Sequence, residues 1–265
     1  KKLLSIISDY EPEYIVNFAA QGMVAQSWQR PEHWYQTNVL AQVKLHNELR
    51  LLSFLKKYVH VSTPESYGST DGWVSENFNF APSTPYAVSR AACDLHLKSF
   101  YKAYDFPVVI TRASNVYGPG QQLYRIIPRT FLCCLTSRKL ELHGGGESIR
   151  SFIAIEDVVR ATRELALEGS VGESYHLSTR ESISIINLVK FICKITGTKF
   201  SDLVEKCDDR LGKDHSYLLD TKKIRTELNW SDKISLEEGL RSTFDWTKKN
   251  IEILKSAPDR YVHKQ

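Results

Sequence analysis

The chain has 265 residues, of which 42% are hydrophobic and 25% charged, the composition of a globular protein with a substantial core. Its formal net charge is only +4, and Lys and Arg are scattered among Asp and Glu, so a nucleic-acid partner is not favoured. No apolar run approaches the roughly 18 residues that span a bilayer, and Lys1-Lys2 leads into only a short apolar stretch, so we expect neither a membrane span nor a signal peptide.

The cysteines indicate the compartment and exclude a familiar kind of metal site. The five are Cys93, Cys133, Cys134, Cys193 and Cys207. They are odd in number and show no CxxC or Cys/His ligand spacing. We therefore expect buried thiols in a reducing cytoplasm and no metal.

The first half of the chain alternates strand-like and helix-like patterns. In chain order these are a strand at 14–18, a helix at 39–55, a strand at 58–61, a helix at 85–104 and a strand at 108–111. Strands that alternate with helices of this length predict βαβ units and a parallel sheet. The strands are continuous apolar runs, which suits a sheet covered on both faces, so the expected fold class is α/β.

After Gly118-Pro119-Gly120 the pattern becomes more mixed. The predicted elements are a helix at 127–135, an extended segment at 140–143, a glycine turn at 144–146, a run at 151–155 leading into a helix, a helix at 185–196, an extended segment at 217–220 and helices at 222–228 and 236–250. We expect a smaller mixed α/β lobe interleaved with the sheet domain and packed against it as one body.

A parallel sheet that binds a dinucleotide normally opens with a strand, a Gly-rich turn and a helix. The chain contains no such element. Gly144-Gly145-Gly146 is the nearest candidate, but it does not lie between a buried strand and a helix, and it is interpreted as a turn.

Two short segments carry the residue types of a catalytic site. Thr63 and Glu65 follow the strand at 58–61, at the end of the sheet where ligands bind in open α/β folds. Tyr86 and Arg90 are spaced i and i+4 early in a helix, so they share one face. A cation beside a phenol favours the phenolate, so we expect Arg90 to lower the pKa of Tyr86. Such a tyrosine could accept a proton from a sugar hydroxyl while hydride leaves the same carbon.

Several stretches together resemble the extended short-chain dehydrogenase/reductase family, and most closely the nucleotide-sugar 4,6-dehydratases of the dTDP-glucose type. The stretches are Phe18-Ala19-Ala20-Gln21, Pro31 through Thr37-Asn38-Val39, Ser62 to Gly68, Tyr86 to Arg90, Arg112 to Pro119, Ile149 to Phe152, Glu156-Asp157, Asp209 to Asp214, and Asp220 through Leu228-Asn229-Trp230 to Trp246. The resemblance implies a Rossmann-like doubly wound sheet that is incomplete at its N-terminal side, where the Gly-rich loop would stand. It assigns residues 1–118 and 146–178 to the NAD-binding domain, and 119–145 and 179–265 to the nucleotide-sugar lobe.

The resemblance also implies roles for single residues. Tyr86 would deprotonate the sugar C4 hydroxyl with help from Thr63, and Glu65 would remove the C5 proton. The catalytic residues implied are Thr63, Glu65, Tyr86 and Arg90, the NAD-binding residues Ala19, Ala20, Gln21, Asn38, Ser62, Tyr86 and Arg90, and the residues for the nucleotide-diphosphate sugar Asn115, Arg150, Arg210 and Asp214. Arginine suits a diphosphate because its planar fork binds two oxygens at once.

Two positions depart from the family pattern. Pro64 stands where the dTDP-type enzymes carry an aspartate that protonates the C6 hydroxyl, so a water would have to supply that proton. Arg90 replaces a lysine, which keeps the charge but places a larger planar group.

Three alternatives stay open from the sequence. The chain is also compatible with a nucleotide-sugar epimerase, with a UDP-glucuronate decarboxylase, and with a catalytically silent nucleotide-sugar-binding homologue or truncated product. The family usually dimerises through two helices per subunit, which here would be those at 39–55 and from Tyr86, so a homodimer is expected.

Overall fold

The computed structural model describes residues 2–208, 212 and 214–263. Its centre is a four-stranded sheet in the order β1 (Tyr14–Asn17), β2 (Lys57–Val61), β4 (Val108–Ala113) and β9 (Ser174–Leu177), with every pair parallel. β2, β4 and β9 are almost entirely buried because helices cover both faces, whereas β1 lies at one edge of the sheet. The predicted α/β fold with a Rossmann-like parallel sheet is confirmed.

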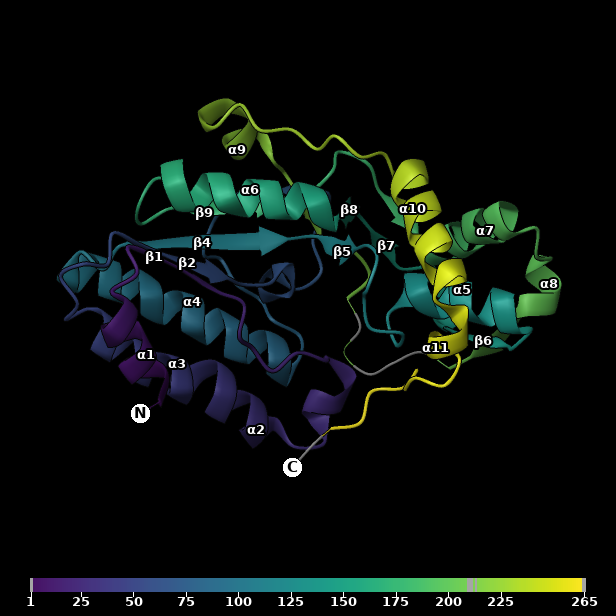
Figure 1. The fold of residues 1–265 in the computed structure, drawn as a ribbon, viewed down its shortest axis with the longest axis horizontal. Coiled ribbons are helices and arrows are strands. Elements are labelled where there is room, and N and C mark those ends of the chain that lie inside the picture. Colours follow the sequence, from purple (N-terminus) through teal and green to yellow (C-terminus); the bar gives the residue numbers. More distant parts are fainter. Residues whose placement is uncertain (1, 209–211, 213, 264–265) are drawn as a thin grey trace.

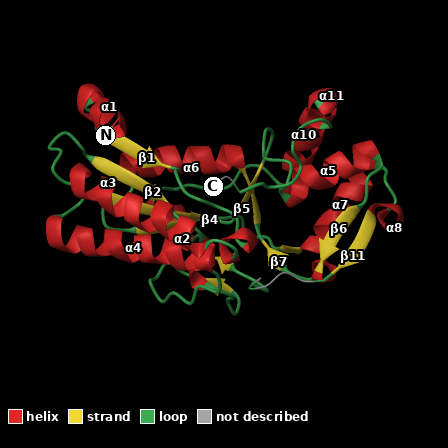
Figure 2. Cartoon of the chain, turned by 90° about the horizontal axis from the view of Figure 1, so that it is seen from below, coloured by secondary structure: helices red, strands yellow, loops and turns green. Residues whose placement is uncertain are grey.

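Helices form a layer on each side of the sheet (Figure 1; seen from below in Figure 2). One layer holds α1 (Lys2–Tyr10), α2 (Pro31–Tyr35), the π-helical turn η2 (Gln36–Leu40), α3 (Ala41–Leu49) and α4 (Pro85–Tyr104). The other is built on α6 (Ile155–Glu168), joined by the short α9 (Lys222–Glu227). Short 3-10 turns η1 (Ala25–Trp28) and η3 (Pro64–Tyr67) precede α2 and follow β2.

A second group of elements lies beyond the carboxyl ends of the sheet strands (Figure 1). It contains α5 (Ile126–Thr136), α7 (Ile185–Thr196), α8 (Phe200–Leu203), α10 (Leu236–Lys249), α11 (Ile251–Leu254) and the parallel pair β6 (Leu140–His143) and β11 (Val204–Cys207). Short pairs connect it to the sheet: β5 (Asn115–Tyr117) with β8 (Phe152–Ala154), β7 (Ile149–Arg150) with β10 (Ile183–Ser184), and β3 (Trp73–Val74) with β12 (Leu218–Leu219).

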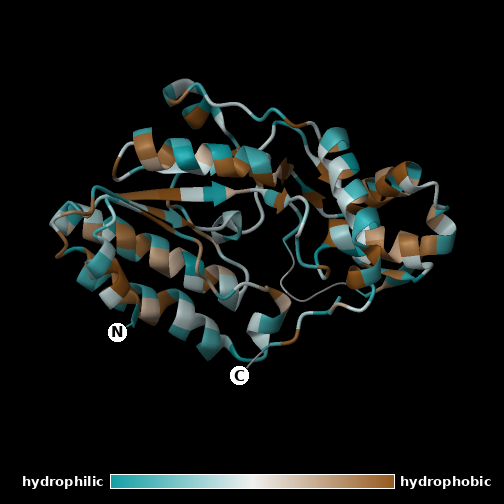
Figure 3. Ribbon diagram, viewed as in Figure 1, coloured by the Kyte–Doolittle hydropathy of each residue, from teal (hydrophilic) through white to brown (hydrophobic). Residues whose placement is uncertain are grey.

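Apolar side chains pack on both faces of the sheet and in the interior of the second group. Figure 3 colours the ribbon by hydropathy, with hydrophobic residues in brown. On the α6 face, Ile224 and Trp230 pack with Val109 and Leu165. This segment was expected in the smaller lobe from its place in the sequence, yet it contacts the sheet, because its apolar residues cover the part of that face next to α6.

Most predicted elements lie where the patterns indicated, and α4 has the expected bounds. The predicted helix at 39–55 is wrong at both ends: the helical segment begins at Pro31, where Pro occupies the first helical position, and ends at Leu49. The glycine turn is confirmed as η4 (Gly144–Gly146), in which all three glycines have positive φ. α1 was not predicted. Among the described residues no helix is long and apolar enough to cross a membrane.

Candidate active site

A cavity of about 550 Å³ lies between the carboxyl ends of the sheet strands and the second group of elements. Side chains from five elements or their following loops meet in its wall. They include Ser62, Thr63, Pro64, Glu65, Tyr86, Asn115, Arg150 and Asp214. The structure therefore brings together residues separated by about 150 positions, at the edge of the sheet where open α/β folds place their ligands.

The loop after β2 fixes Thr63 and Glu65 through local hydrogen bonding. Thr63 is the N-cap of η3, and its hydroxyl accepts the N–H of Glu65 at 3.4 Å. Pro64 occupies the first position of the turn, where its missing N–H costs nothing. Gly68 ends the turn with φ +69 and lies so close to the Ala81 carbonyl that a Cβ would clash. The glycine thus permits the close packing that turns Glu65 toward the cavity.

Tyr86 lies in the first turn of α4, where hydrogen bonds fix the backbone on both sides of it. The hydroxyl of Thr84, the N-cap, accepts the N–H of Ala87 at 3.2 Å. The N–H of Tyr86 itself donates to Ser27 Oγ in η1 at 3.1 Å. The phenol shares a side-chain hydrogen bond with Thr63. Thr63 is therefore positioned between the two titratable groups of the site.

The two titratable groups both favour their protonated forms. Burial raises the pKa of Glu65 to about 7, although the charges of Arg150 and Arg125 act in the opposite direction. Burial, followed by the charge of Glu65, raises the pKa of Tyr86, while Arg90 and the Thr63 hydrogen bond lower it by less. The expectation of a lowered Tyr86 pKa is therefore wrong: Arg90 acts in the expected direction, but desolvation outweighs it.

Arg90 lies behind Tyr86, and its side chain is absent from the cavity wall among the described residues. It is only 2% exposed. Its guanidinium donates to the Val61 carbonyl and approaches His60 Nε2 at 3.3 Å, while Nη1 has no hydrogen-bond partner. The side chain therefore connects α4 to the underside of β2, where it still acts on Tyr86 through its charge.

Arg90→Lys is expected to lower the free energy of unfolding by about 1–2 kcal/mol, because an ammonium is more strongly hydrated than a guanidinium and its side chain does not reproduce the placement of Nη2 between the Val61 carbonyl and His60. Urea unfolding followed by circular dichroism measures this change. The exposed Arg241→Lys on α10, whose side chain pairs only with Glu237, serves as the matched control and should leave stability unchanged. An unchanged midpoint for Arg90→Lys would contradict the assigned contacts.

Asp94, one turn after Arg90 on α4, joins the site to the sheet. Its carboxylate accepts from Ser62 Oγ at 2.7 Å and from Arg112 Nη2 on β4 at 2.8 Å. Asp94 and Arg112 are completely buried. Because the loop after β2 and α4 share this carboxylate, their relative position is fixed, and with it the separation of Glu65 from Tyr86.

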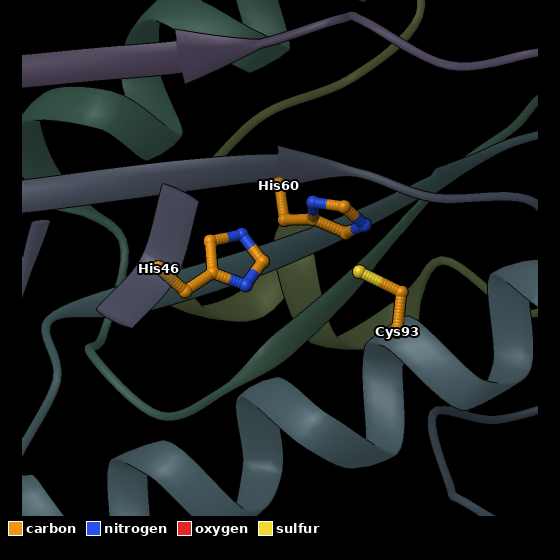
Figure 4. Close-up of side chains that lie close together, drawn as sticks. All are labelled: His46, His60 and Cys93. Carbon is orange, nitrogen blue, oxygen red and sulfur yellow. The ribbon is translucent and has the colours of Figure 1, made fainter. Parts of the chain in front are cut away.

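A buried cluster beside this network has the composition of a metal site (Figure 4). The ligand atoms of His46, His60 and Cys93 all lie within 4.8 Å of one another. Burial lowers the pKa of His46 to about 3 and raises that of the Cys93 thiol to about 12, so the thiolate that a metal needs is strongly disfavoured. The guanidinium of Arg90, 3.3 Å from His60, also repels a cation. We assign the cluster to the core.

The far wall of the cavity contains the predicted substrate residues. Asn115 Oδ1 accepts from the Tyr217 hydroxyl at 3.0 Å. Arg150 donates to the backbone carbonyls of Ile149, His215 and Asp214 and lies over the Tyr217 ring. Asp214 accepts from Ser83 Oγ at 2.9 Å. Arg210 lies outside the described residues.

The predicted cofactor residues lie beside the cavity at the end of β1. Ala19 and Ala20 are exposed directly after the strand. Asn38 is fully buried, and its side-chain amide holds the backbone of Gln21. Asn38 Oδ1 accepts the N–H of Gln21 at 2.7 Å, and Asn38 Nδ2 donates to the carbonyl of Gln21 at 2.9 Å. Ser62 and Tyr86 line the cavity, as do Met23 and Val24 in the same loop as Gln21, whereas Ala19, Ala20, Gln21 and Asn38 are not among its lining residues.

Two cavity residues were missed in the sequence. Arg125 lines the cavity and its charge acts on both Glu65 and Tyr86, and Tyr217 lines the opposite side. The loop that carries Arg125 follows β5, so its place after a strand end was the available signal. Tyr217 precedes a two-residue strand and gave no such signal.

Comparisons with known proteins identify related chains. The family described as GDP-mannose 4,6 dehydratase matches residues 1–243. A dTDP-D-glucose 4,6-dehydratase of Mus musculus is 34% identical over 251 residues, covering 92% of this chain and 70% of the relative. The crystal structure of a dTDP-glucose 4,6-dehydratase from Streptomyces venezuelae with NAD bound superposes with a TM-score of 0.86 at 32% identity, covering 90% of this chain and 74% of that one.

A further relative is much longer than this chain. It is a trifunctional UDP-glucose 4,6-dehydratase, 3,5-epimerase and reductase of Arabidopsis thaliana, 30% identical over 242 residues. The match covers 90% of this chain and 36% of the plant protein. The chain thus spans about a third of the length of that multifunctional relative.

Proposed function

This chain belongs to the GDP-mannose 4,6-dehydratase family, and on that premise we propose that it is an NAD-dependent nucleotide-sugar 4,6-dehydratase. The reaction converts a nucleotide-diphosphate hexose into its 4-keto-6-deoxy form. The observation that carries the proposal is the convergence of Thr63, Glu65 and Tyr86 on one cavity, with the two titratable groups on either side of the threonine.

The chain's own residues can perform the proton transfers at C4 and C5. Tyr86, as the phenolate, takes the proton of the C4 hydroxyl, and Thr63 holds the same oxygen by a hydrogen bond. The ketone at C4 acidifies the C5 proton, and Glu65 accepts it as a carboxylate. Water then leaves from C6, and its departing oxygen takes a proton from a solvent molecule, because Pro64 offers none. Glu65 returns its proton to C5 as C6 is reduced. NAD, when bound, supplies the hydride acceptor for C4 and the hydride donor for C6.

The loop after β1 fits the nicotinamide end of that cofactor. Ala19 and Ala20 are small and exposed, so a planar ring system can approach their backbone. The buried Asn38 would hold Gln21 in this loop, and Ser62 and Tyr86 line the cavity beside it. Arg90 acts on this side through its charge rather than through a surface contact. Residues 1–118 and 146–178 would form the cofactor domain.

The opposite wall fits a nucleotide diphosphate. Arg150 and Arg125 place two guanidinium groups at the cavity, and Asn115 adds an amide. Arginine groups bind diphosphate oxygens in pairs. Arg210 and Asp214 belong to the same proposed end, in the lobe formed by residues 119–145 and 179–265.

A homodimer and a cytoplasmic location complete the proposal. Leu40, Val88 and Leu95 present large side chains to the surface on η2 and α4, with exposures of 50%, 38% and 45%. A second copy would cover them. Cys93, Cys133, Cys134 and Cys193 are free thiols, which suits a reducing compartment.

Incubating the chain with NAD and, in separate reactions, dTDP-glucose, GDP-mannose and UDP-glucuronate tests the function. The expected product has lost one water and carries a ketone at C4 and a methyl group at C6, detected by mass spectrometry and NMR. Release of carbon dioxide would make the chain a decarboxylase, and an isomer of unchanged mass would make it an epimerase. Binding without turnover of any substrate would indicate the silent homologue.

A further inference from the structure

The segment that follows α11 crosses from the second group of elements to the sheet domain (Figure 1, yellow). Its first attachments are ion pairs with the lobe. Asp259 pairs with Arg138 at 2.9 Å, and Arg260 approaches Glu141 at 3.8 Å. Glu141 is itself part of the cavity wall. The segment therefore begins its crossing at the rim of the cavity.

Tyr261 makes the central contact of the crossing. Its hydroxyl accepts from Gln21 Nε2 at 2.6 Å, and its ring meets Tyr124 edge to face at 5.7 Å. Tyr124 lines the cavity from the lobe. Gln21 belongs to the loop at 18–24, whose Met23 and Val24 line the cavity from the sheet side. Tyr261 thus contacts a wall residue of the lobe and, on the sheet side, the loop whose neighbouring residues line the cavity.

His263 attaches the C-terminal end of this segment to the sheet domain. Its Nε2 lies 2.7 Å from His33 Nδ1, and its ring stacks on Trp34 at 4.9 Å. Trp34 is completely buried and donates to the Gly22 carbonyl at 2.8 Å, in the same loop as Gln21. His263 also shares a hydrogen bond with Tyr261 at 3.1 Å. The two residues therefore act on the same loop from two directions.

We propose that residues 256–263 form a strap across the cavity mouth, and that its fastening by Tyr261 and His263 positions the loop at 18–24 and slows the escape of bound nucleotide. The identity of that ligand rests on the proposed function, whereas the effect on the loop does not. Each fastening contact is a single hydrogen bond or ring contact in partial contact with water, so the strap can open without unfolding either lobe.

The test uses the double variant Tyr261→Phe/His263→Ala in the full chain. Both replacements remove the fastening groups while retaining a ring at 261. Val262→Ser is the matched control, because Val262 lies between the two residues and is 75% exposed. Hydrogen exchange reports on residues 18–24, and the dissociation rate of dTDP and of UDP is measured by rapid mixing with a competitor.

In the double variant, we expect amide exchange at 18–24 to accelerate about tenfold and nucleotide dissociation about fivefold, since losing these contacts favours the open strap. The control should match the parent chain in both. Unchanged exchange at 18–24, or faster exchange with unchanged dissociation, would overturn the proposal. If neither nucleotide binds the parent chain, the proposed function fails, and the exchange measurement alone decides whether the strap exists.

Discussion

Replacing Tyr86 by phenylalanine is expected to lower kcat for 4-keto-6-deoxy sugar formation by about 10³-fold, the range that loss of a general base produces. The ring keeps its place, because α4 is held by the Thr84 cap and by the bond from the Tyr86 N–H to Ser27, neither of which involves the phenol. Steady-state kinetics with the preferred nucleotide sugar measures the loss. KM should change little, since the phenol acts on the reacting carbon and leaves the nucleotide contacts in place.

The pH dependence of activity should also differ between the parent chain and Tyr86→Phe. Because burial and Glu65 raise the pKa of Tyr86, the parent chain should gain activity as the solution becomes alkaline. Tyr86→Phe should lose that rise. Tyr101→Phe, near the other end of the same helix, is the control and should retain parental kinetics. Retention of a tenth or more of parental kcat in Tyr86→Phe would show that another group accepts the C4 proton.

The second large effect is expected for Glu65→Gln, which should lower the rate of dehydration by about 10³-fold or more. The glutamine retains the shape of the side chain but cannot accept the C5 proton. Oxidation at C4 should persist, because Tyr86 is intact and the charge that raised its pKa is gone. Rapid mixing with substrate, followed by nicotinamide absorbance, separates the two steps. Loss of both would mean that Glu65 is needed for the first step as well.

The same replacement changes stability in a predictable direction. The pKa of Glu65 is about 7 in the folded chain and 4.5 in its ordinary state, so the folded form binds the proton more tightly. Its contribution to stability is present below pH 4.5 and is lost as the pH rises through 7. Glu65→Gln should therefore be more stable than the parent above pH 7, by about 1–2 kcal/mol after allowance for the partial exposure of the side chain.

Urea unfolding at pH 5 and pH 8 tests the sign. The difference between variant and parent should grow from the lower to the higher pH. In the parent chain, kcat should fall as the pH drops below about 7, because the carboxylate is the active form. Equal stability differences at both pH values would place the Glu65 carboxyl in contact with bulk water.

The positions of Thr63, Glu65 and Tyr86 could be predicted because each depends on local sequence. Strand runs, a proline at a helix start and an i,i+4 pair are periodic or short-range signals, and the carboxyl ends of parallel strands meet at one edge. The pKa of Tyr86 could not be predicted in the same way. It depends on how much water the folded cavity excludes, and the cation four residues away proved the smaller influence.

Contacts between segments far apart in the sequence also could not be predicted. Tyr261 and Gln21 are 240 residues apart, and nothing in either sequence neighbourhood points to the other. The placement of Ile224 and Trp230 on the sheet likewise depends on which apolar surface α6 leaves uncovered. Pattern reasoning found the elements correctly there but not their neighbours.

The carboxylate of Asp94 sets a limit on mutational tolerance around the site. It contacts no cavity, yet it holds Ser62 and Arg112 in a completely buried setting, where removing one partner of an ion pair costs about 3–5 kcal/mol. Libraries that vary the cavity wall to accept new sugars can therefore change Pro64 at a smaller cost in stability than Asp94. Position 94 would remain aspartate in every active clone, although a selection based on substrate contacts would have no reason to protect it.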